Sequence, residues 1–213
     1  MKTDDLIETL AADLPAARPR QVERRLLLAL CAGGLLVLLG VGLWLGFRED
    51  LGAAMMGPTF WIKAAYTGAL GLVGFWLLDR LGRPGSAIRA PLTALAIVMT
   101  AATGFAAWEV VSMPEAERMP AVMGESARVC APLILILSLI AAPFVFGAAQ
   151  GFAPMRPGAA GAAAGLLTAA LATTLYGLHC PEHTASFVMV WYSLGIALAV
   201  AGGAAVGRVL FRW

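Results

Sequence analysis

Charged residues are scarce in this sequence, at 13% of its 213 residues against about 25% in an ordinary soluble domain. The few charges gather in short clusters, and the segments between them are apolar for about 20 residues, the length that crosses a hydrocarbon core of roughly 30 Å. This scarcity excludes a separate soluble domain of ordinary size. It predicts an all-α integral membrane protein whose transmembrane helices form a bundle.

The apolar runs define the predicted spans. Each run must be helical, because a backbone exposed to lipid has to satisfy its hydrogen bonds within its own segment. The domain organisation is then a cytoplasmic tail over residues 1–25 and a six-helix transmembrane domain over 26–213. The six spans cover about 26–47, 60–78, 90–111, 132–149, 158–178 and 185–206.

The basic residues lie mostly on one side of the predicted bundle. If both termini are cytoplasmic, the outer side holds only Arg48, Lys63, Arg118 and Arg128 of the 15 Lys and Arg residues. By the positive-inside rule, this asymmetry predicts a multi-pass protein of the bacterial inner membrane with both termini inside. No basic segment followed directly by an apolar run opens the chain, so we expect the tail not to be a cleaved signal peptide.

Further absences narrow the function. No span carries Asp, Glu or Arg at its middle, which argues against a pump or a proton-coupled transporter. Walker, His-Glu-x-x-His and Gly-x-Ser-x-Gly sequences are also missing, so nothing predicts an enzyme or a resident cofactor. Lys63 and Glu109 lie near the outer ends of their spans, and we expect them to reach water or to pair with each other.

Glycines spaced four residues apart recur in the spans. Small residues at this spacing let helix backbones approach closely, and we expect packing within one bundle rather than a dimer interface. The pairs are Gly42 with Gly46, Gly161 with Gly165, and Gly203 with Gly207.

Cysteine is rare, yet Cys130 and Cys180 fall on the predicted outer side together with both histidines, His179 and His183. Cys130 immediately precedes the fourth span and Cys180 lies between the fifth and sixth, so both are expected at the same membrane depth. A metal site completed by imidazole, a disulfide and two unrelated buried cysteines all remain open interpretations. The third cysteine, Cys31, lies among leucines early in the first span, and we expect it to be inert packing.

The prolines that follow the outer cysteines bear on their reactivity. Pro132 and Pro181 are expected at the start of a helix, where proline is favoured. Each cysteine would then lie beside the positive end of a helix dipole, which favours the thiolate form.

Residues 3–14 are typical of a short amphipathic helix that Pro15 ends. Such a helix is marginal alone in water, so its apolar stripe needs a partner: the membrane surface, the bundle's own loops or another protein. Its polar face is acidic, whereas a helix lying on a membrane usually carries Lys and Arg, so we favour a protein partner. The residues expected to bind this partner are Thr3, Asp4, Leu6, Ile7, Leu10, Asp13 and Leu14.

The sequence resembles the NrsF-type family of negative regulators of an extracytoplasmic-function (ECF) sigma factor. The resemblance rests on the opening segment 1–14, on Cys130 before the fourth span, and on the segment 178–183 leading into Trp191 and Tyr192. The resemblance covers essentially the whole chain. It implies that the tail sequesters a cytoplasmic sigma factor from RNA polymerase. It also implies that Cys130 and Cys180 sense heavy metals or oxidants, with any metal ion bound only transiently, and that sensing releases the sigma factor.

Two other classes compete with this interpretation. A membrane thiol oxidoreductase would relay electrons through Cys130 and Cys180, but such enzymes usually need a further cysteine pair or a quinone site, and Cys31 lies on the opposite side. A haem or metal carrier would use His179 and His183, but one loop supplies both histidines. Quinone reductase activity would favour the first class, and haem absorbance of the purified protein the second.

Overall fold

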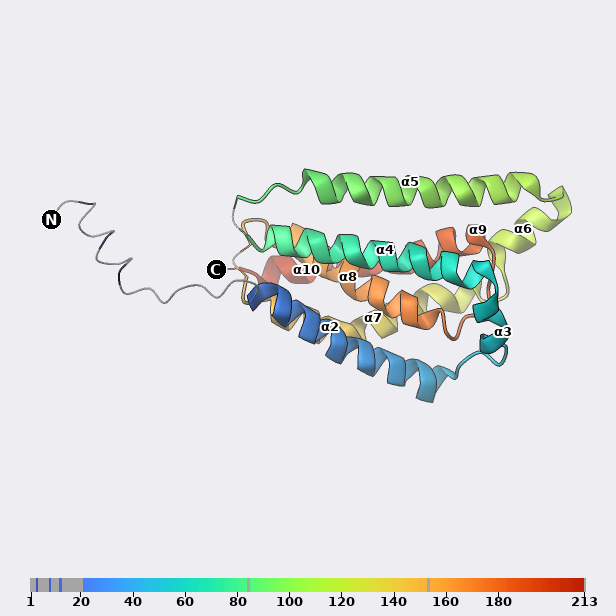
Figure 1. Ribbon diagram of the computed structural model, residues 1–213, viewed down its shortest axis with the longest axis horizontal. Helices are drawn as coiled ribbons and strands as arrows, with labels where there is room; N and C mark the ends of the chain where they lie inside the picture. The colour runs from blue at the N-terminus through green and yellow to red at the C-terminus, as the bar shows by residue number, and fades with distance from the viewer. Residues whose placement is uncertain are drawn as a thin grey trace.

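The computed structural model describes residues 3, 8 and 12 and the ranges 21–83, 85–152 and 154–212. Within these residues all regular secondary structure is helical. Six of the described helices are long and apolar enough to cross a membrane, which confirms the predicted number of spans. Figure 1 shows the long helices running side by side as an elongated bundle.

The helices follow the apolar runs closely, with some differences at their ends. The fourth span begins earlier than predicted, and two short helices, α3 and α6, were not predicted. Two π-helical turns, η1 and η2, adjoin α2 and α10. The elements are α2 (Gln21–Gly40), η1 (Val41–Leu45), α3 (Leu51–Met56), α4 (Pro58–Leu81), α5 (Arg89–Ser112), α6 (Glu115–Met123), α7 (Ala127–Ala149), α8 (Pro157–Tyr176), α9 (Ala185–Phe187), η2 (Val188–Tyr192) and α10 (Ser193–Leu210).

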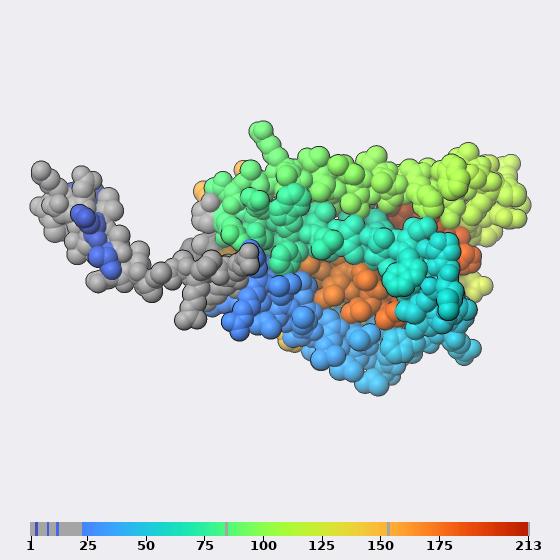
Figure 2. All heavy atoms as spheres, viewed as in Figure 1, coloured from blue at the N-terminus to red at the C-terminus, as the bar shows by residue number. Residues whose placement is uncertain are grey.

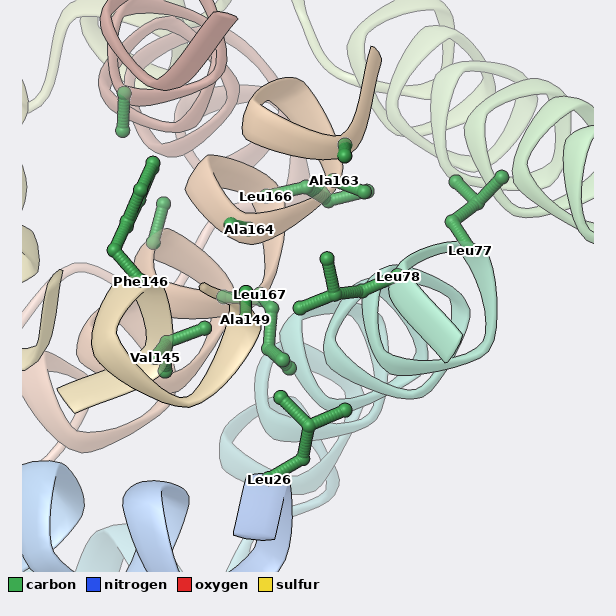
Figure 3. Close-up of a cluster of buried hydrophobic side chains, with 14 of the residues drawn as sticks. Leu26, Leu77, Leu78, Val145, Phe146, Ala149, Ala163, Ala164, Leu166 and Leu167 are labelled. Atoms are coloured by element: carbon green, nitrogen blue, oxygen red, sulfur yellow. The ribbon is translucent and has the colours of Figure 1, made fainter. Parts of the chain in front are cut away.

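Helix α8 lies at the centre of the bundle and packs against α2, α4, α7 and α10. It is the most buried of the long helices, and the space-filling view shows it only through a gap between α4 and α2 (Figure 2). Leu167 of α8 meets Leu78 of α4, Val145 of α7 and Leu26 of α2 in the larger hydrophobic core (Figure 3). By contrast, α5 runs along the outside and buries very little of its surface (Figure 1).

Glycines allow α8 and α10 to approach closely. A Cβ atom on Gly203 would lie 2.5 Å from the Gly161 carbonyl oxygen, and one on Gly207 would lie 2.6 Å from the Gly161 Cα atom. Gly165 similarly faces the backbone of Ala199. The expectation of packing within one bundle is therefore confirmed for these two glycine pairs. It is wrong for Gly42 and Gly46, because they lie in and after η1, where the nearest neighbour of Gly42 is the Phe47 ring.

The bundle has two distinct ends. We call the end with the start of α2, the α4–α5 connection and the end of α10 the tail end, and the opposite end, with α3, α6 and the α8–α9 connection, the thiol end (Figure 1). Because consecutive long helices alternate in direction, the N-terminal tail leaves from the tail end. The cysteines Cys130 and Cys180 lie at the other.

Substitution of Gly203 tests the close packing of α8 and α10. We expect Gly203→Val to destabilise the bundle by about 1–3 kcal/mol or more, because the added atoms meet backbone that cannot move aside. Gly202→Val is the matched control, since nothing lies within 4 Å of a Cβ atom there. Thermal unfolding in detergent, followed by circular dichroism, should show a lower Tm for the first variant only. Equal Tm values would contradict the packing described here.

Candidate functional site

Two cysteines from separate elements meet at the thiol end. Cys130 lies in the first turn of α7, and Cys180 lies in the segment that joins α8 to α9. Both side chains are free and fully buried, and both belong to one buried cluster, in which the Cys130 thiol is near enough to act on the Cys180 sulfur. The structure thus brings together the two cysteines that the sequence placed on one side of the bundle.

The local setting of the cysteines differs from the sequence prediction. The bounds of α7 place Cys130 inside the helix and make Pro132 an interior proline. After Cys180 the chain stays non-helical as far as α9, so Pro181 does not begin a helix either. Cys180 therefore precedes no helix along the chain, yet the Ser126 hydroxyl, directly before α7, lies 4.0 Å from its sulfur, so the N-terminus of α7 is near both cysteines.

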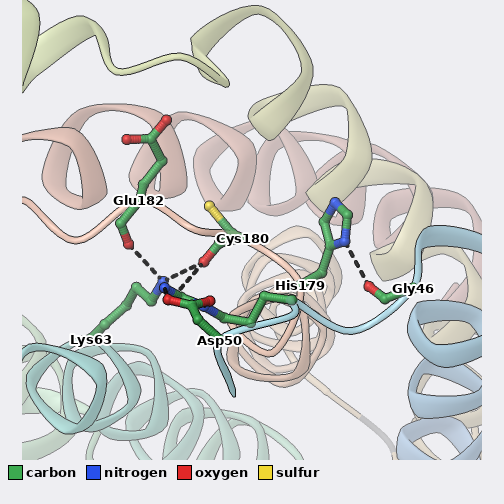
Figure 4. A network of polar contacts seen from close by, with 7 residues as sticks. Gly46, Asp50, Lys63, His179, Cys180 and Glu182 are labelled. Carbon is green, nitrogen blue, oxygen red and sulfur yellow. Dashed lines mark hydrogen bonds and ion pairs between the residues drawn. The ribbon is translucent and has the colours of Figure 1, made fainter. Parts of the chain in front are cut away.

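Two cations hold the backbone of the Cys180 segment (Figure 4). Lys63 Nζ, from α4, donates hydrogen bonds to the Cys180 carbonyl at 3.1 Å and to the Glu182 carbonyl at 3.0 Å. Arg48 follows η1, donates to the same Cys180 carbonyl at 3.2 Å and forms an ion pair with Asp50 at 2.6 Å. Non-helical backbone buried in a bundle needs such donors, because an unpaired carbonyl there costs about 1–3 kcal/mol.

The expectation that Lys63 reaches water or pairs with Glu109 is wrong, whereas Glu109 is partly exposed. Lys63 is only 6% exposed, and its polar contacts are the carbonyls of the Cys180 segment. Glu109 instead accepts hydrogen bonds from the backbone N–H groups of Ala185 at 3.0 Å and Ser186 at 2.8 Å, where α9 begins. Both charges thus satisfy backbone groups that the sequence does not place beside them.

Glu182 is a site residue that sequence reasoning missed. Its carboxylate accepts hydrogen bonds from the backbone N–H groups of Glu125 at 2.8 Å and Ser126 at 2.9 Å, and from the Ser126 hydroxyl at 2.8 Å. These groups directly precede α7, so the carboxylate satisfies free donors at the positive end of that helix. The Cys180 segment is thereby fastened to the helix that carries Cys130.

The structure separates both histidines from the thiols. His179 Nδ1 forms a hydrogen bond with the Gly46 carbonyl at 2.8 Å, and its ring packs against Tyr176. His183 lines a cavity of about 500 Å³ between α4, α5 and α9, which Lys63 also lines. Among the residues described, no group of three or more His, Cys, Asp or Glu side chains is placed to hold a metal ion. The metal set that includes the histidines stays a prediction.

Two tyrosines enclose the thiols. Tyr176 of α8 and Tyr192 of η2 are almost fully buried, with ring centroids 5.8 Å apart. The Lys63 ammonium group lies 5.6 Å from the centroid of the Tyr192 ring. The buried Tyr192 hydroxyl forms no hydrogen bond with any described group. Its place in a π-helical turn is a feature common at functional sites.

Several groups act on the Cys180 thiol together. The neighbouring Cys130 thiol has the largest effect and lowers the pKa of Cys180. The Lys63 charge lowers this pKa further, whereas burial of the thiol opposes both effects. Cys180 therefore favours the thiolate, the form that attacks oxidants and binds soft metal ions, and Cys130 is its nearest thiol neighbour.

Cys31 differs from the expected inert packing residue. It is exposed on α2, although leucines surround it in the sequence. Apolar neighbours along a helix do not imply burial where much of the apolar surface faces outward. Cys31 also lies away from the thiol end, because α2 reaches that end only with its last turn and the loop that follows.

The predicted partner-binding helix over residues 3–14 lies largely outside the described residues. Thr3, Glu8 and Ala12 are described, and each is helical and exposed. The remaining predicted binding residues, Asp4, Leu6, Ile7, Leu10, Asp13 and Leu14, fall outside the described part.

Comparison with known proteins assigns this arrangement to a family. The model described as "Negative regulator of sigma F" matches residues 10–213. The chain belongs to the NrsF family. This confirms the resemblance inferred from the sequence, and the matched residues include both thiols and every long helix.

Two curated NrsF relatives align with the whole chain over their own full lengths. "Anti-sigma-F factor NrsF" of Caulobacter vibrioides is 45% identical over 215 residues, and "Probable anti-sigma-F factor NrsF" of Azospira oryzae is 35% identical over 216 residues. No solved structure matches the chain.

The effect of the Cys130 thiol on the pKa of Cys180 predicts how the reactivity of Cys180 depends on pH. In a Cys31→Ala background, we expect Cys130→Ala to raise the pKa of Cys180, because the donor that stabilises the thiolate is lost. The rate at which a small neutral alkylating reagent modifies Cys180 should then rise only at higher pH, as measured by mass spectrometry. Cys130→Ser keeps a donor and is the matched control. Identical pH profiles for the two variants would contradict the assigned role of Cys130.

Proposed function

We propose that this protein is an inner-membrane anti-sigma factor that holds an ECF sigma factor through its N-terminal tail. The full-length identity of 45% to a protein named as an anti-sigma-F factor is the observation that carries the proposal. The six membrane-length helices support a multi-pass protein. The distribution of Lys and Arg supports cytoplasmic termini, and hence a tail end inside and a thiol end in the periplasm.

The tail supplies the sigma-binding element of this proposal. Its apolar stripe, centred on Leu6, Leu10 and Leu14, would lie in a groove of the sigma factor, as amphipathic helices do in other complexes. The acidic residues around the stripe would face basic groups on the sigma factor. A sigma factor held at the membrane in this way is kept from RNA polymerase.

The cysteine pair supplies the sensor. With a peroxide, the Cys180 thiolate attacks the O–O bond to give a sulfenic acid, and the Cys130 thiol then displaces water to form the disulfide. Two thiols and one peroxide thus yield one disulfide and two waters. With a divalent soft metal ion such as cadmium, the Cys180 thiolate binds the ion and Cys130 joins it as a second thiolate, releasing its proton to solvent. In both cases the geometry of the two sulfur atoms changes.

Contacts at the thiol end provide a route from the sensor to α2, and hence to the tail. The Arg48 backbone N–H donates to the Leu178 carbonyl at 3.1 Å, and His179 Nδ1 bonds to the Gly46 carbonyl at 2.8 Å. Together with the Arg48 side chain on the Cys180 carbonyl, these bonds fasten the end of η1 to the residues beside Cys180. A shift of that segment would therefore act on α2, whose other end continues into the tail.

Aspartate substitutions on the apolar stripe test sigma-factor binding. We expect Leu6→Asp with Leu10→Asp and Leu14→Asp to abolish co-purification of the sigma factor with protein carrying a C-terminal affinity tag. Desolvating the new charges in an apolar groove would be too costly for binding. Thr9→Asp with Ala12→Asp adds charge off the stripe and should still retain the sigma factor. Retention by the stripe variant, at unchanged Tm, would refute the role of the tail.

Serine substitution of both outer cysteines tests the sensor. We expect Cys130→Ser with Cys180→Ser to bind the sigma factor normally and to lose most of its release by cadmium or peroxide, because neither disulfide nor thiolate can form. Cys31→Ser is the matched control and should respond as the wild type does. Release can be measured as transcription from a sigma-dependent promoter. A wild-type response in the double variant would remove the sensor role.

A further inference from the structure

A basic hollow lies at the tail end, away from the cysteines. It has a volume of about 590 Å³ and lies between the end of α4, the start of α5 and the residues before α8. Its lining combines positive charge with apolar surface. The arginines are Arg80, Arg83, Arg89 and Arg156, and the apolar residues include Leu81, Ile88, Leu92 and Met155.

Most of this positive charge is not neutralised by the described part of the chain. Arg83 forms ion pairs with Asp79 at 2.7 Å and with Glu23 at 3.0 Å. The other three arginines of the lining have no ion-pair partner among the described residues. The apolar part is also uncovered, since Met155 is 77% and Leu92 is 45% exposed. The hollow therefore suits an occupant that is both acidic and apolar.

The N-terminal tail begins beside this hollow. The ion pair between Arg83 and Glu23 joins the lining of the hollow to the first turn of α2. Between Leu14, the last residue of the predicted tail helix, and Gln21, where α2 begins, lie six residues. Six or seven extended residues reach about 20 Å, which is enough for the chain to turn back to the hollow.

The chemistry of the tail matches that of the hollow. Residues 3–14 carry Asp4, Asp5, Glu8 and Asp13 around a stripe of leucine and isoleucine. We propose that the tail docks in this basic hollow of its own bundle when no sigma factor is bound, with its apolar stripe over Leu92 and Met155 and its carboxylates facing the arginines. The docked tail presents the stripe that the sigma factor would also need, so the two partners exclude each other.

Self-docking would set the apparent affinity for the sigma factor. The affinity of a ligand is reduced in proportion to the fraction of protein that is competent to bind it, so a docked tail weakens sigma-factor binding. It would also cover the apolar stripe after release and slow recapture. This competition rests on the proposed function, whereas docking of the tail on the bundle does not.

Cross-linking in the full chain tests the docking. In a Cys31→Ser background, Ala11→Cys in the tail and Ser86→Cys in the lining of the hollow should be joined by a short bis-maleimide in protein reconstituted without sigma factor. We expect Arg80→Gln, Arg89→Gln and Arg156→Gln together to reduce the yield several-fold. Arg128→Gln, at the thiol end, is the matched control and should leave the yield unchanged. An absent cross-link, or one indifferent to the arginines, would overturn the proposal.

Two further measurements, with added sigma factor and with lipids of different charge, test the competition and distinguish tail docking from lipid binding. Sigma factor should suppress the cross-link, and it should bind several-fold more tightly to the triple Gln variant than to wild type. A cross-link that persists while sigma factor is bound would overturn the competition. A cross-link seen in neutral lipid but abolished by anionic lipid would assign the hollow to lipid headgroups instead. If sigma factor binds no form of the chain while the cross-link still depends on the arginines, the proposed function fails and the docking stands.

Discussion

The two hydrogen bonds from Lys63 to the carbonyls of Cys180 and Glu182 are the contacts on which the thiol end depends. The segment between α8 and α9 is not helical, yet Cys180 is fully buried, so its backbone cannot rely on water. Lys63 satisfies that backbone and at the same time places a positive charge near the Cys180 sulfur. One side chain thus serves both the packing of the segment and the reactivity of its thiol. Arg48 and Glu182 extend the same arrangement to η1 and to the start of α7.

This arrangement requires the helices to be held in a fixed register, and small residues at the helix contacts fix that register. Apolar side chains gain little by leaving lipid for a protein interior, so helices in a membrane associate mainly through close packing. Gly161, Gly165, Gly203 and Gly207 bring α8 and α10 into backbone contact. Since Tyr176 ends α8 and Tyr192 directly precedes α10, the same contact also sets the tyrosines around the cysteine pair.

The two ends of the bundle have different chemistry, and α2 connects them. At the thiol end, buried charges and aromatic rings surround a reactive pair. At the tail end, exposed arginines surround a hollow beside the first turn of α2. The proposed signal is accordingly a mechanical one along α2, because the contacts of Gly46 and Arg48 join η1 to the Cys180 segment. The proposed tail-docking site would give the released tail a second position, which a two-state switch requires.

The sequence by itself determined the number of long helices, the placement of Cys130 and Cys180 at one end and the family, whereas the structure brought the two thiols together. Hydropathy reports helix number because the thickness of a bilayer imposes a length on every span. The tertiary structure alone decided the partners of Lys63, Glu109 and Glu182. Those partners are backbone groups of segments distant in sequence, and only packing brings them within reach. The tertiary structure also corrected the predicted helix starts near Cys130 and Cys180 and the predicted burial of Cys31. Both features depend on packing against neighbouring helices rather than on neighbouring residues in the sequence.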